Sequence, residues 1–310
     1  MTTADNGIAT RQNSERNIKI LAAQRQLYKE AKVVSHYQFA ACVLLPILIV
    51  FVKPLIPSNT SILAIITLLS ILIIISNSFI FEKVVKSKKE KAARFQETFD
   101  TMVLDLSWNS ALCGPRNQAV HDLDQIFNKY LKKNKSLNTL KDWYPQEYSK
   151  VEIFAGRIMC QQVNTVWDGK LRDYFQNFLK ILFIFCVLIV LIIGLLKNDS
   201  VVNTFVSIAA PLAPICIYTY KQYTDNKATI SRSTKLSYDA ENLWVKLLSN
   251  IQDPELSESS RKLQNDIYKY RESALMIWDW FYWVFRNKQE CNMNSSAEIV
   301  VEDYRNSRNS

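Results

Sequence analysis

Glycine, proline and histidine are scarce in this chain of 310 residues, which has five glycines, eight prolines and two histidines. So few turn-forming residues disfavour a β-rich fold with many tight turns, and the sequence predicts an all-α protein. His36 and His121 have no arrangement suited to catalysis, and no glycine-rich phosphate loop, GxSxG or HExxH motif occurs. We therefore expect no enzymatic activity, no metal site and no cofactor.

Charged residues are almost missing from four long stretches. Residues 62–81 have no ionisable group and residues 178–196 have only Lys180, and each stretch is about as long as a helix that crosses a bilayer. Residues 33–52 and 201–220 are similar, with no charge after Phe39 in the first of them. The alternative is buried helices of a soluble protein, but their apolar runs are typically about 10–14 residues long. The sequence predicts an integral membrane protein with four transmembrane helices.

Short connectors join these spans into two transmembrane hairpins, residues 33–81 and residues 178–220. Basic residues gather before the first span and directly after the second, whereas the connectors contain only Lys53 and Lys197. The positive-inside rule then places both termini and the long central region in the cytoplasm. This arrangement explains much of the net charge of +9 without a DNA or RNA partner.

The rest of the chain is expected to form helical cytoplasmic segments. These are an N-terminal helix in residues 1–32, helical regions in residues 82–177 and 221–290, and a tail in residues 291–310. Apolar spacing predicts a helix that enters the first span from near Ser14, and a last helix that runs from about Ser257 to Phe285. The tail is rich in Asn and Ser, so we expect it to be disordered.

The last predicted helix contains the aromatic stretch MIWDWFYWVF, residues 276–285. With Asp279 inside it, this stretch is too short for a fifth span. Heptad spacing places Ile277, Phe281 and Phe285 toward helical partners and leaves Trp278, Asp279 and Tyr282 on the flanks. Packing in a helical core, anchoring at the membrane interface and stacking on a ligand all remain possible.

A polar stripe marks the best candidate ligand surface, on a long helix predicted from Val151 toward the third span. Steps of three and four residues place its members on one helix face. Guanidinium groups suit phosphate, and the amide and carboxyl groups can recognise bases or ribose. A solvated helix face is the alternative. The stripe comprises Arg157, Gln161, Asn164, Asp168 and Arg172, and further candidate contacts are Trp108, Asn109, Arg271 and Trp278.

Small and polar residues also share faces within the spans. Such residues either hold helices together or line an aqueous path, and in a homo-oligomer the same faces could do both. The candidate pore-lining residues are Thr67, Ser70 and Asn77 in the second span and Asn203, Ser207 and Tyr218 in the fourth.

Several phrases in this sequence, taken in order, resemble one family. They are RQN at Arg11–Asn13, LAAQRQLYKEAK, FDTMVLDLSWN at Phe99–Asn109, DWYP at Asp142–Pro145, CQQVNTVWDGKLRDYF at Cys160–Phe175, and RESALMIWDWFYWVFR. Their order around two hydrophobic hairpins resembles the SMODS-associated four-transmembrane effector family, from about residue 10 to residue 290.

The resemblance implies a role in bacterial antiphage defence (CBASS), in the inner membrane, beside an enzyme that makes a cyclic oligonucleotide. The expected function is permeabilisation of the membrane when this nucleotide binds the cytoplasmic helices, with the lipid bilayer and other copies of the chain as partners. A second hypothesis is a membrane-anchored scaffold, whose cytoplasmic helices recruit a protein partner.

Overall fold

The computed structural model describes residues 5–52, 60–134, 136–166, 169–197, 209–249, 255–285 and 292–309. All regular elements in these ranges are helical, as the sequence predicts. The helices of the first half are α1 (Ile8–Gln12), α2 (Glu15–Phe39), the π-helical η1 (Ala40–Leu44), α3 (Leu45–Val52), α4 (Thr60–Ser76), the π-helical η3 (Asn77–Phe81), α5 (Glu82–Val103), α6 (Ser110–Cys113), α7 (Arg116–Ala119) and α8 (Leu123–Lys133). Those that follow are the 3-10 turns η4 (Asn138–Leu140) and η5 (Gln146–Lys150), then α9 (Ile153–Val166), α10 (Gly169–Lys197), α12 (Ala210–Leu248), α13 (Glu255–Ser273), α14 (Asp279–Phe285) and α15 (Asn292–Asn309).

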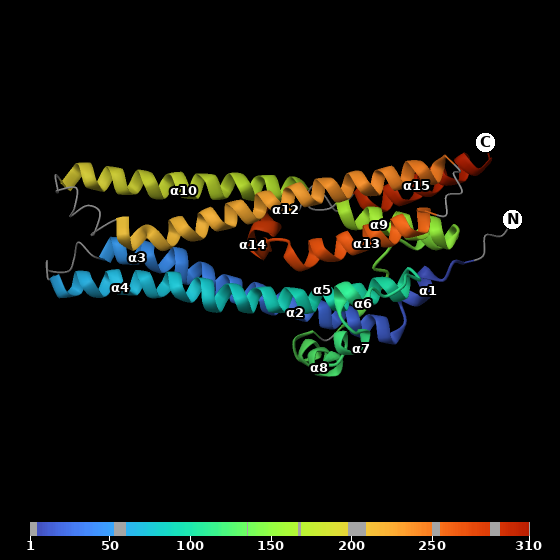
Figure 1. Ribbon diagram of the computed structural model, residues 1–310, viewed down its shortest axis with the longest axis horizontal. Helices are drawn as coiled ribbons and strands as arrows, with labels where there is room; N and C mark the ends of the chain where they lie inside the picture. The colour runs from blue at the N-terminus through green and yellow to red at the C-terminus, as the bar shows by residue number, and fades with distance from the viewer. Residues whose placement is uncertain are drawn as a thin grey trace.

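The molecule is elongated, and long helices run from one end to the other (Figure 1). The tips of α3, α4, α10 and α12 form one end, which we call the apolar end. Both termini lie at the opposite end, together with α1, α9 and α15, and we call this the polar end (Figure 1). Helix α2 packs along α5, and α10 packs along α12.

Two helices in the described residues are long and apolar enough to cross a membrane, within Glu15–Val50 and Ala64–Val103. At the apolar end, Leu48 is 59% exposed and Leu72 is 60% exposed. Exposed leucine and isoleucine side chains of this kind are favourable in contact with lipid and unfavourable in contact with water. Helix α10 presents Ile181, 66% exposed, in the same way. The number of four spans stays a prediction, because residues 201–208 lie outside the described residues.

The polar end encloses its own hydrophobic core, to which the C-terminal helix contributes. Ala297, Val301 and Tyr304 of α15 are buried against the core that contains Trp244. The prediction of a disordered tail after residue 290 is therefore wrong for Asn292–Asn309. The three core residues are spaced by four and three positions, so they form one apolar helix face, which the polar composition of this segment obscures.

The predicted helix from Ser257 to Phe285 is interrupted. Helix α13 ends at Ser273, and α14 begins at Asp279. Between them, Leu275 N donates to Thr229 Oγ1 of α12 at 3.2 Å, so a contact with another helix replaces the helical hydrogen bond. The heptad register does not continue through this interruption, and Trp278 is 2% exposed instead of lying on a flank.

Both N-terminal hairpin helices contain a π-helical turn where the polar end meets the apolar end. These turns are η1 and η3, and a hydrogen bond of 2.8 Å from Gln38 Nε2 to Asn77 Oδ1 links the two helices beside them. Asn77 Nδ2 also donates to Glu82 Oε1 at 3.0 Å. Because π-helical turns are rare and often occur at functional sites, this level of the molecule is a candidate for conformational change.

Gly156 of α9 allows the N-terminal segment to pack closely. A Cβ atom at this position would lie 2.5 Å from the carbonyl oxygen of Tyr148 and 2.6 Å from Asn6 Nδ2. We expect Gly156→Ala to lower the free energy of unfolding by about 1–3 kcal/mol, because overpacking must displace the backbone. Thermal unfolding in detergent measures this, with Ala9→Ser as a mild control in the same segment. Equal melting temperatures for Gly156→Ala and wild type would contradict the close approach.

Candidate ligand-binding site

Phrases that are distant in the sequence meet at the polar end. The side chain of Gln12 pairs with the backbone of Tyr144, since its Nε2 donates to the carbonyl at 3.1 Å and its Oε1 accepts from the N–H at 2.8 Å. Asn13 Nδ2 donates to the side-chain carboxylate of Asp142 at 2.8 Å, and Asn13 Oδ1 accepts from the backbone N–H of Asp142 at 3.0 Å. The RQN and DWYP phrases therefore hold each other in place.

The centre of this region is Asp100 on α5, which is fully buried. Its carboxylate accepts hydrogen bonds from Tyr144 Oη at 2.7 Å and from Gln264 Nε2 at 3.0 Å. It also forms an ion pair with Arg271 of α13. Burial alone would lower the pKa of Arg271, but Asp100 raises it above the ordinary value, so the arginine stays charged.

A second buried carboxylate, Glu97, lies one helical turn before Asp100. It accepts from Arg261 Nη2 at 2.6 Å and from Gln264 Nε2 at 2.8 Å. Burial raises the pKa of Glu97 above its ordinary value, although Arg261 opposes the shift. The two carboxylates and the two arginines balance in charge, so this network fixes α13 against α5 and leaves little net charge inside.

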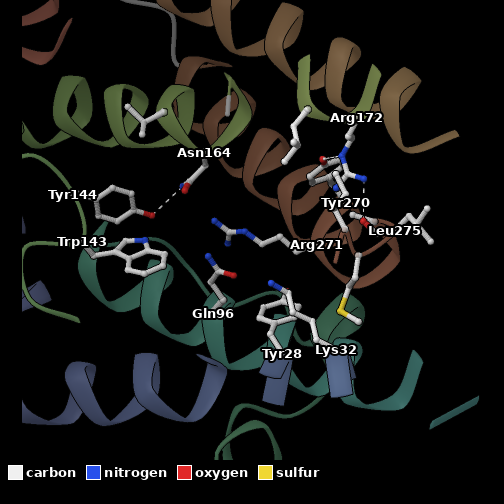
Figure 2. Close-up of a pocket in the computed structure, with 15 residues that line it drawn as sticks. Tyr28, Lys32, Gln96, Trp143, Tyr144, Asn164, Arg172, Tyr270, Arg271 and Leu275 are labelled. Carbon is white, nitrogen blue, oxygen red and sulfur yellow. Dashed lines mark hydrogen bonds between the residues drawn. The ribbon is translucent and has the colours of Figure 1, made fainter. Parts of the chain in front are cut away.

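Beside the network lies a cavity of about 550 Å³. This is within the range of about 300–1,000 Å³ usual for small-molecule sites. Its walls come from α2, α5, α9, α10, α13 and the segment before α14 (Figure 2). Its polar and aromatic lining consists of Lys32, Arg172, Arg271, Gln96, Asn164, Tyr28, Trp143, Tyr144 and Tyr270.

Three cationic side chains face the cavity. Figure 2 shows the guanidinium of Arg271 between Gln96 and Asn164. The side chain of Arg271 is only 9% exposed, and its Nη2 atom has no hydrogen-bond partner among the described residues. Arg172 donates to Tyr270 Oη at 3.2 Å and to the carbonyl of Leu275 at 2.9 Å, and Lys32 pairs with Asp279.

A fourth cation, Lys89, lies behind this wall on α5, outside the apolar stretch 62–81, and is 8% exposed. Burial lowers its pKa to about 8, and the positive charge of Arg172 acts in the same direction. Asp225, Glu90 and Glu272 oppose this shift. Lys89 and Arg172 therefore lie close enough for their positive charges to interact, and the carboxylates of Asp225, Glu90 and Glu272 partly offset them.

We expect Lys89→Met to stabilise the protein at neutral pH, and the gain to shrink as pH rises from about 8 to about 10.5. In this window the unfolded chain still binds the Lys89 proton that the folded chain has released, so wild-type stability rises with pH. Thermal unfolding in detergent at neutral pH and at about pH 9.5 measures the change. The exposed Lys29 of α2 supplies the control Lys29→Met, and the same pH dependence in both variants would contradict the burial of Lys89.

This lining suits a phosphate-containing, ring-bearing ligand. Arginine and lysine bind phosphate oxygens by charge-assisted hydrogen bonds. Aromatic faces such as those of Trp143 and Tyr270 can stack on bases, and the amides of Gln96 and Asn164 can donate to or accept from base edges. Asn164 already donates to Tyr144 Oη at 3.0 Å.

The structure brings three of the nine predicted ligand contacts to this cavity: Asn164, Arg172 and Arg271. Arg157 instead donates to the carbonyls of Leu104 and Asp105, at 2.9 and 2.7 Å. Gln161, fully buried, donates to the carbonyl of Ser260 at 2.9 Å. These two side chains hold helices together, and the stripe is largely buried rather than solvated.

The remaining predicted contacts lie elsewhere. Trp108 packs near Cys113 and donates to the carbonyl of Gly114 at 2.8 Å, and Asn109 caps α6. Trp278 lies directly beyond the cavity-lining Ile277, within the core of the apolar end. Asp168 lies outside the described residues, and the predicted ligand contacts of all these residues stay predictions.

Pore lining also stays a prediction. Ser70, Asn77 and Tyr218 are buried within the single chain, and Ser70 Oγ donates to the carbonyl of Ile66 at 3.0 Å in its own helix. Thr67 is partly exposed. The structure does not describe Asn203 and Ser207.

Sequence reasoning missed several cavity residues. By sequence, Lys32 is one of the basic residues that precede the first span, and Tyr28 lies in the predicted helix that enters this span. Asp100 offered the clearest missed signal, since an acidic residue in a segment with the apolar residues Phe95, Phe99 and Met102 needs a partner if the helix is buried. That partner, Arg271, lies 171 positions away in the sequence.

Comparison of the sequence with known proteins supports the family resemblance of these motifs. Residues 6–300 match the model of the SMODS-associating 4TM effector domain. A probable CBASS effector molecule of Bacillus cereus strain VD146 is 28% identical over 294 residues, which cover 91% of this chain and 94% of that protein. No solved structure is significantly similar to the chain. The chain therefore belongs to the family of SMODS-associating four-transmembrane effector domains, a membrane-protein family of CBASS antiphage effectors.

Proposed function

We propose that this effector permeabilises the bacterial inner membrane when a cyclic oligonucleotide binds the cavity beside Arg271. The position of the cavity is the observation that supports this proposal. Lys32 of α2 and Arg172 of α10 line it, and both helices continue to the apolar end. A ligand that shifts these side chains therefore acts on helices that enter the membrane.

The proposed membrane arrangement has four spans in two hairpins, residues 33–81 and 178–220, with both termini in the cytoplasm. The apolar exposure of α4 and α10 supports lipid contact. The proposed cytoplasmic part consists of residues 1–32, 82–177 and 221–290, together with α15. We further propose that the protein is not an enzyme and that copies of the chain assemble to form the permeable state.

The proposed assembly would repack polar groups that are buried within a single chain. Asn77 is buried and hydrogen-bonded to Gln38 and Glu82, so within one copy it joins helices instead of lining water. Repacking of this level among several copies would expose such groups to a shared path. A ligand can drive the change only if it binds the permeable arrangement more tightly.

Dye leakage from liposomes tests the proposal. Purified full-length protein is reconstituted and exposed to a panel of cyclic di- and trinucleotides, with linear dinucleotides as controls. Leakage triggered by one cyclic nucleotide is expected. Absence of leakage with every nucleotide, in protein shown to be folded and inserted, would overturn the proposal and favour the scaffold hypothesis.

A further inference from the structure

A short segment separates the cavity from the core of the apolar end. We call it the strap and define it as Ala274–Trp278, between α13 and α14. Four consecutive strap residues, Ala274 to Ile277, line the cavity. The fifth, Trp278, lies in the core of the apolar end. The strap is therefore positioned to respond to whatever occupies the cavity.

Cavity cations hold the strap at two points. Arg172 Nη1 donates to the carbonyl of Leu275 at 2.9 Å (Figure 2). Lys32 forms an ion pair with Asp279, the residue that follows the strap. The side chains of Lys32 and Asp279 are 32% and 51% exposed, and ion pairs this exposed contribute little free energy. A competing anion can therefore replace Asp279 readily.

Trp278 connects the strap to the helices that enter the apolar end. Its ring lies 4.5 Å from the ring of Phe39 on α2 and 5.3 Å from the ring of Phe175 on α10, between ring centroids. Phe39 directly precedes the π-helical turn η1. Movement of the strap would therefore change the packing of Trp278 between Phe39 of α2 and Phe175 of α10, at the level of this turn.

The third cavity cation has a vacant donor. Nη1 of Arg271 pairs with Asp100, while Nη2 is buried without a partner in the described part of the chain. A buried guanidinium N–H with no acceptor is unfavourable, and an anionic oxygen in the cavity would satisfy it. The carboxylate of Asp100 holds the guanidinium in a fixed orientation.

We propose that the cavity binds a phosphate anion through Arg271, Arg172 and Lys32, and that this anion releases the strap by replacing Leu275 O and Asp279. The inference rests on the proposed function for the identity of the anion, a phosphodiester of a cyclic oligonucleotide. A charge-assisted bond from Arg172 to phosphate is stronger than its bond to a neutral carbonyl. Release of the strap then withdraws Trp278 from between α2 and α10.

The test compares Asp279→Asn with Asp303→Asn, a matched change at an exposed position of α15. Binding of inorganic pyrophosphate and of the cyclic nucleotide panel to full-length protein in nanodiscs is measured by calorimetry. Asp279→Asn is expected to bind about threefold to fivefold more tightly than wild type, because the competing carboxylate is gone. Asp303→Asn is expected to bind with the affinity of wild type. Equal affinity in both variants would contradict the proposal that Asp279 competes with the anion.

A second variant tests the anion site itself. Arg271→Lys keeps a positive charge for Asp100 but removes the Nη2 donor, so affinity is expected to fall about tenfold or more. The exposed Arg16 supplies the control Arg16→Lys, and unchanged affinity in Arg271→Lys would place the anion elsewhere. Nanodiscs of zwitterionic and of anionic lipid separate a soluble phosphodiester from a lipid headgroup, since only a headgroup would compete with pyrophosphate in the anionic discs.

The outcomes separate this inference from the proposed function. One outcome is that a cyclic nucleotide triggers leakage at the same concentration in Asp279→Asn and in wild type. This outcome would remove the strap mechanism and leave the proposed function intact. Tighter pyrophosphate binding by Asp279→Asn without leakage by any nucleotide would keep the anion site and remove the proposed function.

Discussion

Replacing Arg271 with methionine is expected to lower the free energy of unfolding by about 3–5 kcal/mol, because the fully buried Asp100 loses its charged partner. Thermal or denaturant unfolding in detergent, without nucleotide, measures the loss. The exposed Arg16 provides the matched variant Arg16→Met, for which a change within about 0.5 kcal/mol is expected.

The double variant Asp100→Asn, Arg271→Met separates charge from packing. An asparagine can still accept from Tyr144 Oη, and no unpaired charge remains inside. Part of the lost stability is therefore expected to return. If Arg271→Met were as stable as Arg16→Met, the Asp100–Arg271 pair could not be an important link between α5 and α13.

Trp278→Ala is the second change with a large expected effect. Removing a fully packed tryptophan side chain typically costs about 3–5 kcal/mol, and here the loss opens a void between Phe39 and Phe175. Unfolding of the reconstituted or detergent-bound protein measures it. We also expect ligand-independent leakage from liposomes, since the packing that joins α2 and α10 through Trp278 is lost.

The control for this change lies two residues away on α14. Trp280 is 46% exposed, so Trp280→Ala removes the same side chain with a smaller loss of buried area. Equal destabilisation by the two variants would contradict the central position of Trp278. Leakage by Trp280→Ala alone would instead point to contact of α14 with lipid.

The helical class and the long α2 were predictable because they depend on local signals. The scarcity of glycine and the apolar spacing after Ser14 both act over short distances in the chain. The interruption before α14 was not predictable in this way. It depends on a hydrogen bond from Leu275 to Thr229, 46 positions earlier, and a heptad pattern carries no information about such a contact.

The site was predictable in part for the same reason. Phosphate chemistry singles out arginines, which predicts Arg172 and Arg271, and Asn164 is predicted because it shares the helical spacing of Arg172. Lys32 was missed, since only the fold shows which of many lysines faces a cavity. Arg157 was misleading, because a buried arginine that holds backbone carbonyls looks identical in sequence to one that binds a ligand.

The π-helical turns also decide which side of each helix faces lipid. One residue corresponds to about 100° of rotation in an α-helix, and a π-helical turn accommodates about one extra residue. The outer parts of the first two spans are therefore rotated by about this angle relative to uninterrupted helices. Deleting one residue from Ala40–Leu44 would turn outward side chains such as Leu48 around the helix axis, although the composition of the span would hardly change.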